Sequence, residues 1–459
     1  MAKNWSETWS ALVAEYERLH PRSRRLDERA QAVLPGGDTR STVFYLPFPV
    51  YIDKGEGCRL YDVDGGYMID FLNNYTSMVL GHAHPAVVAS VREWIVRGQA
   101  FGAGLEAQVT LAEEICSRVP SVEKVRFCNS GTEATLFAIR AARAHTGKDR
   151  IVKMEGGYHG THDAAEVSTK PSLSAAGPAE APYSVAESRG IPRSVLGDVV
   201  VVPFNDLDAL ERAFKKHKDE IAGVIVESFL GAGGVIEAAP GYLQGVRSLC
   251  DRYGMVFILD EIQSLRLAPG GAQEYYGVKA DLTAMGKIIG GGFPVGAFGG
   301  RDDIMAQFSP KGASPISHGG TFNGNLATMV AGLVTLKHLT KAECDRLNAL
   351  GERLKAGFQG VMDSMGLAGQ VTGVGSILNV HFTKGKIRNY RDAARADRTL
   401  PGFVHLSMIN KGIFSARRMM FSISTPMTPV EVDKAISVFQ ESMSDFKPTI
   451  AMSTPELLV

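Results

Sequence analysis

The hydrophobic positions between residues 124 and 300 form short, continuous apolar runs separated by stretches with helical spacing. We predict β-strands at the apolar runs 124–128, 150–154, 199–202, 224–227, 256–260, 282–285 and 295–298. Helices are predicted between them, including 132–146, 206–217 and 241–253. Continuous apolar strands that alternate with helices are typical of a mostly parallel sheet covered on both faces. The pattern therefore predicts an α/β fold whose ligands bind beyond the carboxyl ends of the strands.

The two ends of the chain show a different pattern. Residues 5–20 carry apolar side chains at helical spacing, and a second helix is predicted from Pro21 to about residue 33. Further along, we predict strands near 50–53, 59–62 and 68–71, helices at 84–98, 105–118 and 430–446, and a helical region at 324–365. We expect the segments 1–70 and 331–459 to form a smaller α+β domain beside a large domain at 71–330.

The charge of the chain is balanced, with 49 Lys and Arg residues against 49 Asp and Glu residues. No global field therefore favours nucleic acid or a membrane surface as a partner. The five cysteines have no paired spacing, so we expect reduced thiols. The N-terminal region has no apolar signal segment, and no apolar run reaches the roughly 18 residues that a spanning helix needs. These observations together predict a cytoplasmic protein.

One aspartate and one lysine stand at the ends of two successive predicted strands. Residues 258–263 read ILDEIQ, and residues 284–292 read AMGKIIGGG, which places Asp260 and Lys287 at the strand ends. A pyridoxal phosphate enzyme needs a lysine that forms a Schiff base with the cofactor aldehyde and an acid that pairs with its pyridinium nitrogen. A pair of ordinary surface charges is the alternative, but both residues end apolar strands rather than lie in polar loops. The pair therefore predicts a pyridoxal phosphate site.

A tight turn after the strand 124–128 is a candidate phosphate site. Ser130, Gly131 and Thr132 begin a predicted helix, and backbone amides with hydroxyls at a helix N-terminus bind anions. An ordinary helix cap explains this turn equally well when it is taken alone. A second glycine-flanked turn at 318–325, which contains Thr321, allows the same two interpretations.

Residues 157–160 read Gly-Tyr-His-Gly and follow the strand 150–154. Tyr158 could stack on a cofactor ring, because the glycines allow a close approach, although a loop aromatic packed on the core is an equal alternative. His159 and His162 have a spacing found in metal sites. No third ligand is near them in the sequence, so we predict no metal site.

The ordered motifs NSGTEAT, GGYHG, ILDEIQ, MGKIIGGGFPVGAFGGR and GGTFNGN resemble those of the class III pyridoxal-phosphate aminotransferases of fold type I. The resemblance extends over nearly the full chain. It implies an α/β fold type I transferase with pyridoxal 5′-phosphate as cofactor. The branches that the chain resembles most are the glutamate-1-semialdehyde aminomutases and the β-amino-acid transaminases of the β-phenylalanine type.

The resemblance also implies roles for individual residues. It makes Lys287 the Schiff-base lysine and proton shuttle, and Asp260 the partner of the pyridinium nitrogen. It implies that the phosphate is bound by Ser130, Gly131 and Thr132, joined by Thr321 from the other subunit of an obligate homodimer. The remaining cofactor contacts that it implies are Tyr158 on the ring face, Ile262 opposite, Gln263 at the ring hydroxyl, and His159 and Glu227 nearby. Ser228 follows Glu227 where the family usually has proline.

Two arginines are candidate carboxylate ligands for an amino acid and an oxo acid. The resemblance places Arg40 where β-amino-acid transaminases carry a carboxylate-binding arginine, although the aminomutases have one in the same region. Arg418 resembles a second such residue, and its neighbour Arg417 could replace it. Both could form bidentate forks, and exposed surface arginines are the alternative.

We therefore predict a homodimeric aminotransferase that moves an amino group from a β-amino acid, with aromatic ones among the candidates, to an oxo acid such as 2-oxoglutarate or pyruvate. The alternative within the family is a glutamate-1-semialdehyde 2,1-aminomutase. A non-catalytic metabolite-binding protein of the same fold is a third interpretation, which the presence of Lys287 disfavours.

Overall fold

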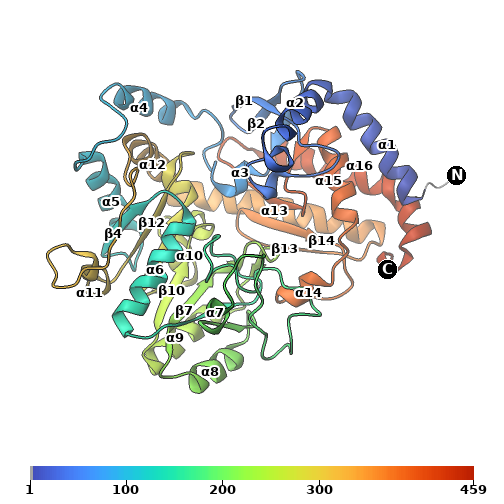
Figure 1. Cartoon of the computed structure of the whole chain (residues 1–459). Helices are drawn as coiled ribbons and strands as arrows, with labels where there is room; N and C mark the ends of the chain where they lie inside the picture. Colours follow the sequence, from blue (N-terminus) through green and yellow to red (C-terminus); the bar gives the residue numbers. More distant parts are fainter. Residues whose placement is uncertain (1–3) are drawn as a thin grey trace.

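The computed structural model describes residues 4–459, and a seven-stranded sheet forms its centre (Figure 1). The strands lie in the order β4 (Lys124–Cys128), β12 (Gly296–Gly300), β11 (Leu282–Gly286), β10 (Val256–Asp260), β7 (Ile221–Glu227), β5 (Arg150–Met154) and β6 (Val199–Val202). β12 runs antiparallel to both of its neighbours, and the other pairs are parallel. The prediction of a mostly parallel sheet is therefore confirmed.

Helices cover both faces of this sheet. Ile258 packs in a cluster with α6 (Gly131–Thr146), whereas its neighbours Phe257 and Leu259 pack with α8 (Leu207–Lys216) and α9 (Tyr242–Tyr253). Successive side chains of a strand point to opposite faces, so a strand buried on both sides must be apolar at every position. This arrangement explains why the sequence shows continuous apolar runs rather than alternation.

The two ends of the chain meet in a second region beside the large sheet. The short strand β15 (Ile413–Phe414) pairs with β3 (Tyr67–Asp70). β3 also pairs with β2 (Arg59–Asp62), and β2 pairs with β1 (Ile52–Glu56). A three-stranded sheet there contains β13 (Gln370–Val374), β14 (Ile377–His381) and β16 (Met420–Ser422). Figure 1 shows α1 (Trp5–Leu19) beside α15 (Leu400–Asn410) and α16 (Pro429–Ser453). We propose residues 70 and 330 as the boundaries between this region and the large domain.

The remaining elements are short or connect these layers. The helices are α2 (Pro21–Gln31), α3 (Asn73–Thr76), α4 (Pro85–Ile95), α5 (Glu106–Arg118), α7 (Arg193–Gly197), α10 (Gly271–Tyr276), α11 (Asp302–Met305), α12 (Leu326–His338), α13 (Lys341–Met365) and α14 (Tyr390–Ala394), and the strands are β8 (Phe229–Leu230) and β9 (Ile236–Glu237). The helical region that we predicted at 324–365 is two helices, because Thr340 caps α13 by accepting a hydrogen bond from the Glu343 amide at 3.3 Å. Within residues 4–459, no helix is both long enough and apolar enough to cross a bilayer.

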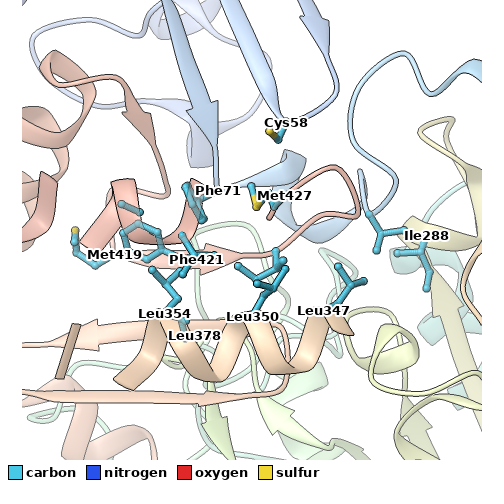
Figure 2. Close-up of a cluster of buried hydrophobic side chains, with 14 of the residues drawn as sticks. Cys58, Phe71, Ile288, Leu347, Leu350, Leu354, Leu378, Met419, Phe421 and Met427 are labelled. Carbon is cyan, nitrogen blue, oxygen red and sulfur yellow. The ribbon is translucent and has the colours of Figure 1, made fainter. Parts of the chain in front are cut away.

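One core cluster joins the second region to the edge of the large sheet (Figure 2). Leu347, Leu350 and Leu354 of α13 form an apolar stripe that packs in this cluster with Phe421 of β16. Each buried leucine contributes about 1.5–3 kcal/mol relative to an exposed one. The cluster extends to Ile288, which is 2% exposed. The backbone next to Lys287 is therefore anchored in the core.

His405 is a buried titratable group of α15 that makes the stability of the fold depend on pH. Its side chain is 2% exposed, and neither ring nitrogen has a hydrogen-bond partner within the described part of the chain. Burial lowers the pKa of His405 to about 3, and Arg417 acts in the same direction. An unfolded histidine titrates near 6.5, so the unfolded state binds one more proton between about pH 6.5 and pH 3. The contribution of neutral His405 is complete above about pH 6.5 and is lost as the pH falls.

We expect His405→Phe to make the free energy of unfolding less sensitive to acid, by about 1.4 kcal/mol per pH unit between about pH 6 and pH 4. Denaturant titrations at several pH values would measure this slope. His145→Gln, at an exposed position of α6, should leave the slope unchanged. An unaltered slope in His405→Phe would contradict the assignment of a neutral His405 in the folded state.

Candidate active site

Three ionisable side chains meet at the carboxyl edge of the large sheet. Asp260 ends β10 and lies opposite Glu227 of β7 on one side and Ala284 of β11 on the other. Lys287 follows β11 directly after Gly286. Its φ of +51° lies in the left-handed region, which costs an L-residue roughly 1–2 kcal/mol and is often found at functional sites. The prediction that Asp260 and Lys287 lie at neighbouring strand ends is confirmed.

Asp260 is oriented by two hydrogen bonds. Its Oδ1 accepts from the Ile262 amide at 3.0 Å, and its Oδ2 lies 2.8 Å from Nδ1 of His159. Burial lowers the pKa of His159 although Asp260 favours the charged form, so we assign a neutral ring that donates from Nδ1. The Nε2 of His159 has no partner among the described residues. The arrangement holds an oriented carboxylate at the strand end.

Lys287 and Glu227 both have strongly shifted pKa values. Burial lowers the pKa of Lys287 to about 8, against the attraction of Asp260 and Glu227, and Arg418 lowers it further. Burial and the Asp260 charge raise the pKa of Glu227 to about 8. A group whose pKa lies near neutral pH can both take and give a proton, which suits general acid–base chemistry.

The predicted phosphate turn lies at the N-terminus of α6. Ser130 caps this helix by accepting from the Glu133 amide at 3.1 Å, and the first amides of any α-helix have no partner within it. Thr132 Oγ1 accepts from the Thr161 amide at 3.2 Å. A Cβ on Gly160 would lie 2.6 Å from Thr132 Cα, so only glycine fits there. The turn at 130–132 and the loop at 157–161 are thus packed together, as a shared cofactor site requires.

The side chains that follow Asp260 reach the same place. A Cβ on Gly131 would lie 2.7 Å from Cδ1 of Ile262, so the isoleucine covers the phosphate turn. Gln263 packs against Gly231 in the turn after β8. Tyr158 is 39% exposed and its amide donates to Glu227 Oε2 at 3.0 Å. These contacts bring Tyr158 and Ile262 close to the strand end at Asp260.

The turn at 318–325 lies next to the phosphate turn of the same chain. Asn129 Nδ2 donates to Asn323 Oδ1 at 2.7 Å, and Thr321 is exposed. The cap of α12 is supplied by Asn325, which accepts from the Thr328 amide at 3.1 Å. The helix cap therefore does not need Thr321. Its role in a second subunit's phosphate site stays a prediction.

The two candidate arginines have different surroundings. Nη1 of Arg418 donates to the carbonyl oxygens of Gly231 at 2.9 Å and Ala232 at 2.6 Å, and within residues 4–459 no carboxylate forms an ion pair with it. Arg417 is exposed, so of these two arginines Arg418 faces the site. Arg40 is also exposed and donates to Asn74 Oδ1 at 2.9 Å. The structure therefore provides one partly buried guanidinium without a counter-ion and one at the surface.

Two buried basic residues near the site were missed by the sequence analysis. Lys153 of β5 donates from Nζ to the carbonyl oxygens of Gly157 at 2.9 Å and Ala165 at 2.8 Å. Arg266 follows the Asp260 strand and is fully buried, with Nε donating to Ser376 Oγ at 2.9 Å and Nη2 donating to the Ile423 carbonyl. A charged residue inside an otherwise apolar strand was the available signal for Lys153.

The residues of this edge fit the predicted cofactor. An amine with a lowered pKa, an oriented carboxylate and a helix N-terminus match the aldehyde, the ring nitrogen and the phosphate of pyridoxal phosphate. The Nε2 of buried His159, which has no partner among the described residues, and the guanidinium of Arg418, which has no counter-ion there, both indicate a site built to receive polar groups.

Comparisons with known proteins agree with this geometry. A family model described as aminotransferase class-III matches residues 41–413. The glutamate-1-semialdehyde 2,1-aminomutase of Methanothrix thermoacetophila is 43% identical over 396 residues, which are 85% of this chain and 89% of that protein. An omega-transaminase structure from Sphaerobacter thermophilus is 44% identical, with a TM-score of 0.89 over 93% of this chain and 98% of its own. A β-phenylalanine aminotransferase structure from Variovorax paradoxus is 35% identical, with a TM-score of 0.87 over 96% of this chain and 98% of its own.

The family match extends over most of the chain, and both solved relatives share its fold. The expectation of a fold type I transferase is therefore confirmed. The chain belongs to the class-III aminotransferase family, whose enzymes depend on pyridoxal phosphate.

Proposed function

We propose that this class-III aminotransferase moves an amino group on a substrate whose carboxylate is bound by Arg418. The observation that carries the proposal is the guanidinium of Arg418, which is held by two backbone carbonyls and lies close enough to Lys287 to lower its pKa. A fixed, partly buried guanidinium without a counter-ion is a suitable receptor for one carboxylate.

The proposed roles of the residues follow from their positions. Pyridoxal phosphate, when bound, supplies an electron sink for negative charge on the substrate carbon. Lys287 would hold the cofactor, and its free amine would take the proton from the carbon that loses the amino group and deliver it to the carbon that receives that group. Asp260 would keep the proton on the ring nitrogen, and His159 orients Asp260. The phosphate would be bound by Ser130, Gly131 and Thr132. The ring would be enclosed by Tyr158, Ile262 and Gln263.

The names of the curated relatives favour the intramolecular reaction. Eight curated relatives, at 36–43% identity, are all named as glutamate-1-semialdehyde 2,1-aminomutases. These names support the aminomutase, predicted above as the alternative, more than the β-amino-acid aminotransferase. The first candidate reaction is therefore the exchange of the amino and oxo groups within glutamate-1-semialdehyde, with the substrate carboxylate bound by Arg418.

Transfer from a β-amino acid to an oxo acid is the second candidate. The two solved transaminases at 44% and 35% identity support it, and one of them is named for β-phenylalanine. The presence of Arg40 as a second arginine also supports it. A β-amino acid and an oxo acid carry their carboxylates at different distances from the reacting carbon, so each needs its own partner. The two candidates are separated by incubating the enzyme with glutamate-1-semialdehyde alone, or with β-phenylalanine plus 2-oxoglutarate, and identifying the products. The aminomutase converts the first substrate, and the β-amino-acid aminotransferase converts the second pair.

We expect Arg418→Ala to lower kcat/KM about 10- to 150-fold for the substrate whose carboxylate it binds, because a charge-assisted pair contributes about 1.5–3 kcal/mol. Arg417→Ala is the matched control and should retain wild-type kinetics, since Arg417 is exposed. If β-amino-acid transfer is the reaction, Arg40→Ala should slow only the β-amino half-reaction. Equal kinetics in Arg418→Ala and Arg417→Ala would contradict the proposed carboxylate site.

We also propose that the active unit is a cytoplasmic homodimer whose phosphate sites are completed by Thr321 of the partner subunit. The exposure of Thr321 on a turn beside the phosphate turn supports this arrangement.

A further inference from the structure

The peptide bond between Gly157 and Tyr158 is held at both ends by buried side chains, one that donates a hydrogen bond and one that accepts. Lys153 Nζ donates to the Gly157 carbonyl oxygen at 2.9 Å, and Glu227 Oε2 accepts from the Tyr158 amide at 3.0 Å. The Gly157 carbonyl and the Tyr158 amide belong to the same peptide unit. Lys153 is 1% exposed and Glu227 is 4% exposed, so neither interaction is weakened by solvent.

The large sheet determines this geometry. Lys153 on β5 is paired in register with Ile225 on the adjacent strand β7, which ends at Glu227. Lys153 also donates to the carbonyls of Ala165 and Val167, so its ammonium is surrounded by carbonyl oxygens of the loop. Burial lowers the pKa of Lys153 to about 7, and the charge of Glu227 acts in the opposite direction. The two strands therefore hold the two side chains on either side of the loop.

The donor and the acceptor select one orientation of the peptide. A flip of the peptide plane by half a turn would direct its carbonyl oxygen at the accepting oxygen of Glu227 and its N–H at the donating nitrogen of Lys153, which breaks both hydrogen bonds. Such flips are otherwise easy beside glycine, and Gly156 and Gly160 both have positive φ values, of +85° and +97°. Tyr158 lies between these glycines and is 39% exposed, so packing alone does not fix its ring.

The same carboxylate also reaches the substrate side of the site. Glu227 Oε1 accepts from the Gly231 amide at 3.1 Å, and the Gly231 carbonyl accepts from Arg418 at 2.9 Å. One buried side chain thus orients both the loop that carries Tyr158 and the loop that anchors Arg418.

We propose that Lys153 and Glu227 are a pair of positioning residues that lock the Gly157–Tyr158 peptide and thereby hold the Tyr158 ring over the cofactor. This inference rests on the proposed contact between Tyr158 and the cofactor ring. Lys153 does not touch the reacting atoms, and its effect passes through the peptide that it binds.

The test measures the dissociation constant of pyridoxal phosphate by titration of the apoenzyme, and the visible circular dichroism that the bound cofactor acquires. We expect Lys153→Met and Glu227→Gln each to weaken binding at least about tenfold and to reduce the dichroism. The double variant should lose less than the product of the two effects, because both side chains act on the same peptide. In a Tyr158→Leu background, Lys153→Met should add little further loss.

Asp281→Asn is the matched control for removal of a buried charge. Asp281 is 6% exposed and binds Arg247, Arg301 and the Phe257 amide, at the opposite end of the sheet from Lys287. We expect it to lower the Tm without changing the dissociation constant. If Lys153→Met does not yield folded protein, Glu227→Gln in the wild-type background and in the Tyr158→Leu background provides the same comparison.

The outcomes separate this inference from the proposed function. If Lys153→Met and Glu227→Gln behave like Asp281→Asn, or if they act with full size in the Tyr158→Leu background, the positioning role is overturned while the proposed function stands. If Tyr158→Leu leaves cofactor binding unchanged, the proposed contact of Tyr158 fails and the positioning role fails with it.

Discussion

Replacement of Lys287 by alanine is expected to lower turnover by at least about ten-thousandfold while the fold is retained. The expectation combines the loss of general acid–base catalysis, about 10²–10⁴-fold, with the loss of the nucleophilic amine. Lys287 is mostly buried and the pKa of its amine is lowered to about 8, so no solvent-exposed lysine can replace it. Alanine adopts the left-handed conformation of position 287 no less easily than lysine, so the backbone should not change.

Borohydride reduction of the holoenzyme followed by peptide mass analysis would identify the lysine that carries the cofactor. The wild type should yield one modified peptide, containing Lys287, and Lys287→Ala should yield none. Lys279→Ala, an exposed lysine just before β11, should keep both the modification and the activity. A modified peptide that contains another lysine would refute the assignment.

The second large effect is expected for Asp260→Asn, which should lower kcat at least about a hundredfold. An opposite charge at hydrogen-bond distance shifts a pKa by about 1–3 units, and a neutral amide cannot hold the proton on the ring nitrogen in this way. The amide oxygen can still accept from Ile262, so the strand end should keep its shape. Steady-state kinetics together with the pH dependence of the cofactor's visible absorbance would measure the effect.

Glu261→Gln is the control for this experiment, because it removes the adjacent buried carboxylate. Glu261 accepts from the amides of Ala272 and Gln273 at 2.8 and 3.0 Å and so supports the start of α10. It should lower the Tm with little change in kcat. If Asp260→Asn retained kcat within a factor of about three, the role of Asp260 at the ring nitrogen would be wrong.

The large sheet could be predicted from the sequence because burial on both faces makes each strand a continuous apolar run. The direction of a strand is not encoded in this way, and β12 is antiparallel although the predicted strand 295–298, which overlaps it, is as apolar as its neighbours. The break between α12 and α13 was missed for a similar reason. Leu339 and Thr340 continue the helical pattern, and only the capping bond of Thr340 reveals a new helix.

In the site, Asp260 and Lys287 could be predicted because charged residues at the ends of apolar strands are unusual. The bond between His159 and Asp260 joins positions 101 residues apart, and no local pattern encodes it. The choice between Arg417 and Arg418 depended on the backbone reversal at Met419, whose φ is +64°. Lys153 was missed because its partners are carbonyl oxygens of a loop without periodicity.

The buried bonds of Arg266 have a consequence for the order of events during synthesis. This arginine lies six residues after Asp260 and donates to Ser376 and Ile423. Arg418 likewise binds the turn after β8, by donating to the Gly231 carbonyl. Ser376, Arg418 and Ile423 leave the ribosome long after Lys287, on the order of ten seconds later at usual rates of elongation. A nascent chain that ends before residue 418 therefore has the lysine and the aspartate but lacks the contacts that fix their loops. We infer that cofactor capture awaits the C-terminal segment, so premature termination there yields an incompetent chain rather than a weakened enzyme.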